Sequence, residues 1–125
     1  LGDVRYDIKR GVNRIKKRQQ FRPFAPAILS EFAEEYFEGI TNPYMQYVSK
    51  AKHDYSSVVH VDGTSRVQTV APDCPSVLRR ILEEYYERTG IPMLLNTSLN
   101  IKGQPIVDNW ADAVEFEKKY GVPVF

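Results

Sequence analysis

The 125-residue chain has the length of a single domain, and its 42% hydrophobic and 26% charged residues are ordinary for a globular protein. A single cysteine excludes an intramolecular disulfide, and the lack of any long apolar run excludes a membrane-spanning helix. The start of the chain has no signal peptide and no initiator methionine, so we expect a cytoplasmic segment of a longer protein.

The charge is unevenly distributed. Residues 1–22 carry eight basic and two acidic side chains, a net charge of +6, and the other 103 residues carry nine basic and fourteen acidic side chains, a net charge of −5. A basic block on an acidic domain favours an anionic partner. Phosphate, a nucleotide, nucleic acid and an acidic protein all remain possible at this point.

The first predicted elements are short. Residues 10–20 are basic and compatible with a helix, and the apolar run 27–29 predicts a buried strand after two prolines. Ser30 is a favourable N-cap, so we expect a helix from there that Gly39 ends.

The middle of the chain predicts a hairpin and a long helix. The β-type runs 57–61 and 66–71 flank an Asp62-Gly63 turn, which is typical of a β-hairpin. Residues 75–89 predict a helix with one apolar stripe and with Arg79 on the opposite, polar side.

The remaining elements complete a mixed α/β pattern. Residues 91–96 predict a buried strand that pairs in parallel with 66–71 through the preceding helix. A short strand at 104–107 and a helix at 110–119, capped by Asp108 or Asn109, follow. The expected fold class is therefore α/β.

Three polar clusters are candidates for a functional site. The first is Lys16-x-Arg18 with Arg22, the second is Arg66 at a strand start, and the third is the loop 96–100 after a buried strand. Arginine forks match phosphate geometry, and loops after strands are common ligand sites in α/β sheets. The structural alternatives are a solvated helix face, a strand-end ion pair with Asp62, and an Asx-rich turn.

Other polar residues indicate less. His53 and His60 have no further ligands at metal spacing, so a zinc site is not expected, and Cys74 has no histidine at nucleophile spacing. The sequence contains no Walker A loop and no GxGxxG motif, so any nucleotide must be held in another way.

Three long motifs resemble a known family. FRPFAPAIL (21–29), HVDGTSRVQTV (60–70) and TGIPMLLNTSLNIKGQPIV (89–107) are similar to the C-terminal domain of the O-carbamoyltransferases of nodulation and antibiotic synthesis. Lys16-Lys17-Arg18 and Ser98-Leu99-Asn100 resemble the KxR and SxN signature of the YrdC relatives. The resemblance implies a YrdC-like, twisted, open mixed β-sheet with flanking helices over 1–125, preceded in the family by an actin-like domain that this chain lacks.

The resemblance also implies an enzymatic activity. In the family, this domain joins carbamoyl phosphate and ATP into carbamoyl-adenylate, and the actin-like domain transfers the carbamoyl group to a hydroxyl of an acceptor. Mg²⁺ would be held mainly by the phosphates, and no metal bound by the protein itself is expected in this domain. The partners would be ATP, carbamoyl phosphate and the N-terminal domain, without a membrane. The complete reaction would need that missing domain.

The resemblance assigns site residues by motif position. Those implied for catalysis are Lys16, Arg18, Arg66, Ser98 and Asn100, and those implied for substrate or nucleotide binding are Arg5, Arg22, Met45 and Asn96. The chain departs from the family in three places: Lys17 replaces a usual glycine, Leu99 replaces a usual phenylalanine, and the segment between Arg5 and Arg14 is shortened. The alternative function is a nucleic-acid-binding module that uses the basic segment 1–22.

Overall fold

The computed structural model describes residues 1–124 and confirms the α/β class. Its elements in chain order are α1 (Lys9–Ile15), β1 (Ala25–Leu29), a 3-10 helix (Ser30–Phe32), α2 (Ala33–Tyr36), β2 (Phe37–Glu38), β3 (Ser49–Ala51), β4 (Thr64–Ser65), β5 (Gln68–Val70), α3 (Val77–Thr89), β6 (Met93–Asn96) and α4 (Trp110–Tyr120). The described part of the chain contains no helix that combines the length and the apolar character needed to cross a membrane.

The chain forms two compact units. The larger unit comprises Leu1–Lys9 and Pro23–Thr97, and the smaller unit comprises Arg10–Arg22 and the chain from Ser98 onward. All six strands and the helices α2 and α3 belong to the larger unit, while α4 and almost all of α1 belong to the smaller one.

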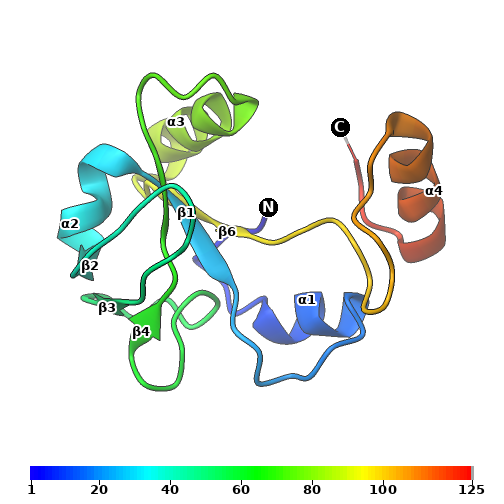
Figure 1. Cartoon of the computed structure of the whole chain (residues 1–125), viewed down its shortest axis with the longest axis horizontal. Helices are drawn as coiled ribbons and strands as arrows, with labels where there is room; N and C mark the ends of the chain where they lie inside the picture. Colours follow the sequence, from blue (N-terminus) through cyan, green and yellow to red (C-terminus); the bar gives the residue numbers. More distant parts are fainter. Residues whose placement is uncertain (125) are drawn as a thin grey trace. The chain divides into compact units, whose positions relative to one another are not determined.

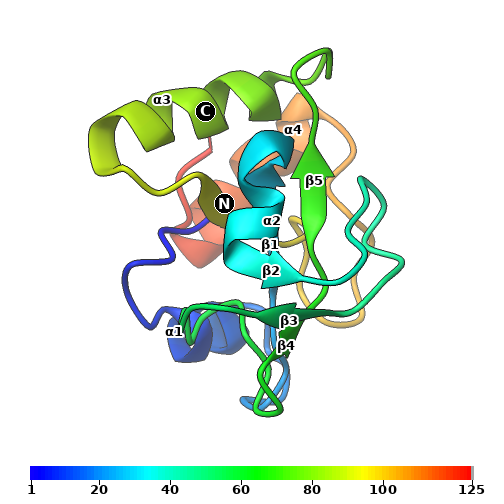
Figure 2. The same cartoon turned by 90° about the vertical axis from the view of Figure 1, so that its left-hand side faces the viewer.

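The main sheet of the larger unit has the order β5-β1-β6, with β1 buried along its whole length (Figures 1 and 2). β1 is parallel to β5 and antiparallel to β6. The predicted parallel pairing of 66–71 with 91–96 is therefore wrong, because β1 lies between these strands. The sequence contains three short buried runs of similar apolarity, and nothing in their patterns indicates which one is central.

The second sheet has the order β2-β3-β4, and it replaces the predicted hairpin. The turn itself forms, since Gly63 N donates to His60 O at 3.0 Å, but residues 57–61 are not a strand. The hydroxyl of Ser57 donates to Tyr6 O (2.8 Å) and accepts from Ile8 N (2.9 Å), and Ser65 Oγ donates to Val58 O (2.7 Å). The Ser65 hydroxyl thus takes Val58 O, a backbone acceptor that the hairpin ladder would use, and Ser57 connects this segment to the backbone of Tyr6 and Ile8.

The helix predicted from Ser30 to Gly39 is shorter than expected. Ser30 does not act as an N-cap: it begins the 3-10 helix, and its hydroxyl donates to Glu31. α2 ends at Tyr36 because Phe37 is extended and buried and pairs with Ala51 of β3. Burial of one phenylalanine in a sheet outweighs the local helix preference of the glutamates.

Helix α3 confirms the predicted helix, with Ser76 as N-cap and Gly90 as a left-handed C-cap. It packs over the main sheet (Figure 1). Leu82 on this helix joins a core cluster with Leu29 and Val70. The predicted placement of Arg79 on the solvated side is wrong, since only 8% of Arg79 is exposed. Its guanidinium is satisfied by two carboxylates and a backbone carbonyl, which makes burial of this cation possible.

Helix α4 in the smaller unit also confirms its prediction. Asn109 is the N-cap, accepting a hydrogen bond from Asp112 N at 3.0 Å, and Gly121 ends the helix with a φ of 65°. The strand predicted at 104–107 does not form. Pro105 has no N–H to donate, and Val107 N makes a single bond to Leu99 O at 3.0 Å.

Candidate functional site

The KxR motif, Lys16 to Arg18, follows directly on α1, and the end of this helix has the backbone bonds of a Schellman motif. Arg18 N donates to Asn13 O and Lys17 N donates to Arg14 O, both at 3.1 Å. Lys17 occupies the left-handed position of the motif, with a φ of 51°. The residue between the two signature cations is therefore the one that reverses the chain after the helix.

Lys16 lies at the centre of a compact polar cluster in the smaller unit. Its ammonium donates to Ser98 O (2.5 Å), Asn100 O (2.9 Å) and Asn100 Oδ1 (3.0 Å), with a longer contact to Ser98 Oγ (3.4 Å). Ser98 Oγ donates in turn to Asn100 Oδ1 at 2.7 Å. The KxR and SxN motifs, separated by some 80 residues of sequence, are thus brought together. We call Lys16, Ser98 and Asn100 the lysine cluster.

The lysine cluster holds a cation without an anion. Only 7% of Lys16 is exposed, and among residues 1–124 it has no carboxylate partner. Burial lowers the pKa of the Lys16 ammonium, and the charge of Arg18 lowers it further. Four oxygens share three ammonium protons, so the long contact to Ser98 Oγ is the one that an oxygen of an anionic ligand can replace.

Arg18 and Arg22, the other two candidate cations after α1, are both held by hydrogen bonds to Asn13. Arg18 Nε donates to Asn13 Oδ1 at 2.5 Å, and Asn13 Nδ2 donates to Arg22 O at 3.0 Å. Burial lowers the pKa of Arg18, and the charge of Arg22 adds to this effect. The Arg22 side chain is exposed. Four cations, Lys16, Lys17, Arg18 and Arg22, thus lie within seven residues on a turn whose backbone is fixed by hydrogen bonds.

Arg66 and Asn96 lie in the larger unit. Because β1 is parallel to β5 and antiparallel to β6, the start of β5 and the end of β6 lie at the same end of the main sheet. Asn96 Nδ2 donates to Gln68 Oε1 at 2.6 Å, and Arg66 precedes Gln68 by two residues. The Arg66 side chain is exposed and has neither a hydrogen bond nor an ion pair to residues 1–124.

Arg5 and Met45 lie in the same unit, but neither is linked to Arg66 or Asn96 by a hydrogen bond among the described residues. Arg5 pairs with Asp3 (Nη2 to Oδ2, 2.7 Å), and the hydroxyl of Tyr85 donates to the same carboxylate at 2.6 Å. These bonds lower the pKa of Asp3 to about 2, so the charge of Arg5 is compensated. Met45 is half-buried with a φ of 55°, inside a turn in which Asn42 Oδ1 accepts from the amides on both sides of it.

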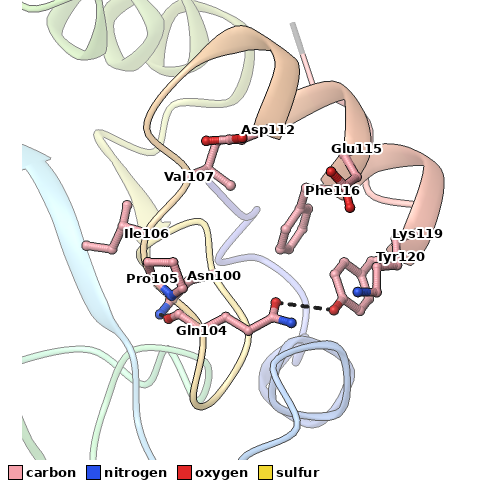
Figure 3. Close-up of a pocket in the computed structure, with 10 residues that line it drawn as sticks. All are labelled: Asn100, Gln104, Pro105, Ile106, Val107, Asp112, Glu115, Phe116, Lys119 and Tyr120. Atoms are coloured by element: carbon pink, nitrogen blue, oxygen red, sulfur yellow. Dashed lines mark hydrogen bonds between the residues drawn. The ribbon is translucent and has the colours of Figure 1, made fainter.

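A pocket of about 300 Å³ borders the lysine cluster within the smaller unit. Figure 3 shows one wall formed by the loop from Asn100 to Val107 and the other by α4, with the rings of Phe116 and Tyr120 facing the loop. Asn100 belongs to both the pocket wall and the lysine cluster, and its Nδ2 donates to Gln104 O at 3.1 Å. The pocket therefore offers apolar and aromatic surface beside the buried cation, together with the charged side chains of Asp112, Glu115 and Lys119 on α4.

The histidines and the cysteine have structural surroundings. His60 Nδ1 lies 3.2 Å from Thr64 Oγ1, the His53 ring packs on Tyr36, and Cys74 packs against the main core. Within residues 1–124, no group of three or more histidine, cysteine, aspartate or glutamate side chains is arranged to hold a metal ion.

Sequence reasoning missed Asn13 and Gln68. Each is a neutral amide that contacts a candidate residue, Arg18 in one case and Asn96 in the other. A single amide on a basic helix has no distinctive pattern. The only signal in the sequence was the position of Asn13, which lies one helical turn before the KxR motif.

The chain matches a family of known proteins over nearly its whole length. Residues 2–125 match the family described as the carbamoyltransferase C-terminus. The chain belongs to this family. The resemblance of the three motifs to the C-terminal domain of O-carbamoyltransferases is thereby confirmed.

The relatives include nodulation proteins and an O-carbamoyltransferase. The chain is 42% identical over 108 residues to nodulation protein NolNO of Sinorhizobium fredii, covering 80% of this chain and 16% of that protein. It is 32% identical over 114 residues to the 3'-hydroxymethylcephem-O-carbamoyltransferase of Amycolatopsis lactamdurans, covering 89% and 22%. The chain thus spans about a fifth of the length of the curated relatives that it matches.

Proposed function

We propose that this chain is the adenylating part of a cytoplasmic carbamoyltransferase, which binds ATP with Mg²⁺ and carbamoyl phosphate and forms carbamoyl-adenylate. A preceding actin-like domain of the same protein would then transfer the carbamoyl group to a hydroxyl of the acceptor. The observation that carries the proposal is the lysine cluster: a buried ammonium is held only by neutral oxygens of the described residues, in a family of carbamoyltransferases.

The proposed chemistry explains the need for cations. One water converts carbamoyl phosphate into carbamate and phosphate, an oxygen of carbamate bonds to the α-phosphorus of ATP, and pyrophosphate leaves. The two substrates are polyanions, so their mutual repulsion opposes this encounter. Fixed positive charges offset the repulsion and stabilise the charge that develops on the leaving phosphates. In this proposal, Mg²⁺ enters with the phosphates of ATP.

Each group has a distinct proposed role. Lys16 provides a point charge for a phosphate oxygen, and Arg18 and Arg22 provide directional guanidinium donors. Ser98 and Asn100 keep the ammonium in place and offer neutral donors and acceptors to the carbamoyl amide. In the larger unit, Arg66 and Asn96 come from the same motif set, and we include them as anion-binding and amide-binding groups.

The pocket beside Asn100 supports the nucleotide part of the proposal. A nucleoside needs an apolar or aromatic surface next to the phosphate site, and Phe116 and Tyr120 supply such a surface. The volume of about 300 Å³ is at the lower end of the range for small-molecule sites.

Calorimetric titration with a non-hydrolysable ATP analogue and Mg²⁺, with and without carbamoyl phosphate, tests the proposal. Lys16→Met should weaken binding by roughly 10- to 100-fold, because it removes a desolvated cation from the phosphate site. Lys118→Met is the matched control: it removes the same charge from an exposed position on α4 and should leave affinity unchanged. No binding by the unmodified chain, or equal effects of the two substitutions, contradicts the proposal. Preferential binding to oligonucleotides, with affinity falling steeply with salt, points to the nucleic-acid alternative.

A further inference from the structure

We infer that Asn13 is a positioning residue that sets the orientation of Arg18 and the path of the loop 16–22, and this inference rests on the proposed function. Asn13 is fully buried (0% exposed), although it lies in the most basic part of the chain. A buried amide is tolerated only when its polar atoms are satisfied. The identity of its partners therefore indicates what the side chain does.

The side chain of Asn13 bonds to the loop that follows α1. Oδ1 accepts from Arg18 Nε at 2.5 Å, and Nδ2 donates to Gln20 O (3.3 Å) and Arg22 O (3.0 Å). Its backbone carbonyl accepts from Arg18 N at 3.1 Å, the long-range bond of the Schellman motif. One residue thus holds the loop at its beginning, at its central guanidinium and at its end.

These bonds determine the direction of Arg18. An exposed arginine samples many rotamers, and ordering it on binding reduces affinity. With Nε bonded to a buried amide, the plane of the guanidinium is fixed relative to α1 before any ligand arrives. The bonds to the carbonyls of Gln20 and Arg22 close the loop back on the helix and so limit where Arg22 can reach. Asn13 acts through these groups and is not itself a ligand contact.

The test is a double-mutant cycle of Asn13→Ala and Arg18→Met, with the affinity for the ATP analogue and Mg²⁺ measured by calorimetry on the folded chain. Asn13→Ala should weaken binding by about 10-fold, as for loss of one charge-assisted hydrogen bond. Arg18→Met should weaken it at least as much. The double variant should bind like Arg18→Met alone, because Asn13 then has no guanidinium to orient. Unchanged affinity of Asn13→Ala, or fully additive losses, overturns the inference.

Asn109→Ala is the matched control. Asn109 is the N-cap of α4 in the same unit, so its replacement destabilises the unit without touching the loop 16–22. It should lower thermal stability and leave affinity unchanged, whereas a loss of affinity equal to that of Asn13→Ala attributes both effects to general destabilisation and overturns the inference. If Asn13→Ala does not fold, Asn13→Leu serves instead, because it fills the buried space of the side chain and removes both the acceptor for Arg18 and the donors to the carbonyls.

Amide hydrogen exchange separates this inference from the proposed function. If the unmodified chain binds no ATP analogue, the proposed function fails, but the loop can still be tested. Asn13→Ala, or Asn13→Leu in its place, should then accelerate exchange at the amide of Arg18, which donates to Asn13 O, and at the amide of Arg22, which donates to Gln19 O, and Asn109→Ala should not. Equal exchange at these amides in the Asn13 variant and the unmodified chain overturns the inference.

Discussion

Two buried cations, Arg79 and Lys16, have opposite kinds of partner: carboxylates in one case and neutral oxygens in the other. Arg79 in the larger unit is 8% exposed and Lys16 in the smaller unit is 7% exposed. Arg79 pairs with Glu31 and Glu83 and donates to Val70 O, and these contacts raise its pKa. Lys16 contacts only neutral oxygens of the described residues, and burial lowers its pKa.

The difference distinguishes a charge that stabilises the fold from one that is available to a ligand. A buried cation with carboxylate partners has its charge compensated before any ligand arrives. A buried cation surrounded only by carbonyl and amide oxygens reduces the stability of the fold. An anionic ligand that binds next to it compensates its charge. The comparison therefore predicts that substitutions at Arg79 alter stability, while substitutions at Lys16 alter affinity.

The largest expected effect on stability is at Arg79. Arg79→Met should reduce the free energy of unfolding by roughly 2–3 kcal/mol, because it breaks two ion pairs and leaves Val70 O without this donor. Chemical denaturation measures the loss, and calorimetry should find unchanged affinity for the ATP analogue. Arg88→Met is the control: it breaks an exposed ion pair with Glu84 and should change stability by less than about 1 kcal/mol. Equal effects of the two substitutions contradict the distinction.

The pH dependence of the Arg79 cluster gives a smaller effect. Arg79 holds the pKa of Glu31 at about 2, against 4.5 for the free side chain. Between these values the unfolded chain binds more protons, so the stability from Glu31 is present above pH 4.5 and is lost as the pH falls towards 2. The Glu31 side chain is 41% exposed, so solvent screening reduces the contribution to about 1 kcal/mol.

Glu31→Gln isolates this contribution from that of Asp3, whose pKa is lowered to about 2 as well. The unmodified chain should be more stable than Glu31→Gln at pH 6, and the gap should close near pH 2.5, as measured by denaturation at each pH. A gap that is constant with pH shows that the Glu31 charge does not stabilise the fold. The same measurement on Asp3→Asn reports the second carboxylate.

The sequence predicted the capped helices better than the strand pairings. α3 and α4 carry their own signals, namely an amphipathic pattern, an N-cap and a C-terminal glycine. The pairing of β5 and β6 with β1 depends on which buried run occupies the centre, and the alternative partners have similar composition. The hairpin prediction failed for a related reason. The Ser57 hydroxyl bonds to the backbone of Tyr6 and Ile8, distant in sequence, and so connects this segment to the start of the chain.

Much the same division holds for the candidate site. The meeting of Lys16 with Ser98 and Asn100 followed from the family signature, whereas residue spacing alone gave three separate clusters. The burial of Arg79 and Asn13 was not predictable, because each is a polar residue in a polar context. Only the tertiary structure places partners around them.

The smallest expected effect concerns Lys17, the third cation beside Lys16 and Arg18. Lys17 has a φ of 51° at the left-handed position of the Schellman motif, a position that favours glycine. A side chain with a Cβ is strained there, so Lys17→Gly should stabilise the chain by about 1 kcal/mol in denaturant unfolding. Lys17→Ala removes the same charge but keeps the Cβ, so it should not stabilise.

Arg14→Gly is the control, at an exposed helical position of α1. It should reduce the free energy of unfolding by about 1 kcal/mol, whereas Lys17→Gly should increase it. If Lys17→Gly and Lys17→Ala stabilise equally, charge repulsion within the basic segment is the cause, and backbone strain is not. That outcome would extend the contrast with Arg79 from Lys16 to its neighbour, since repulsion between adjacent cations would then reduce the stability of the fold.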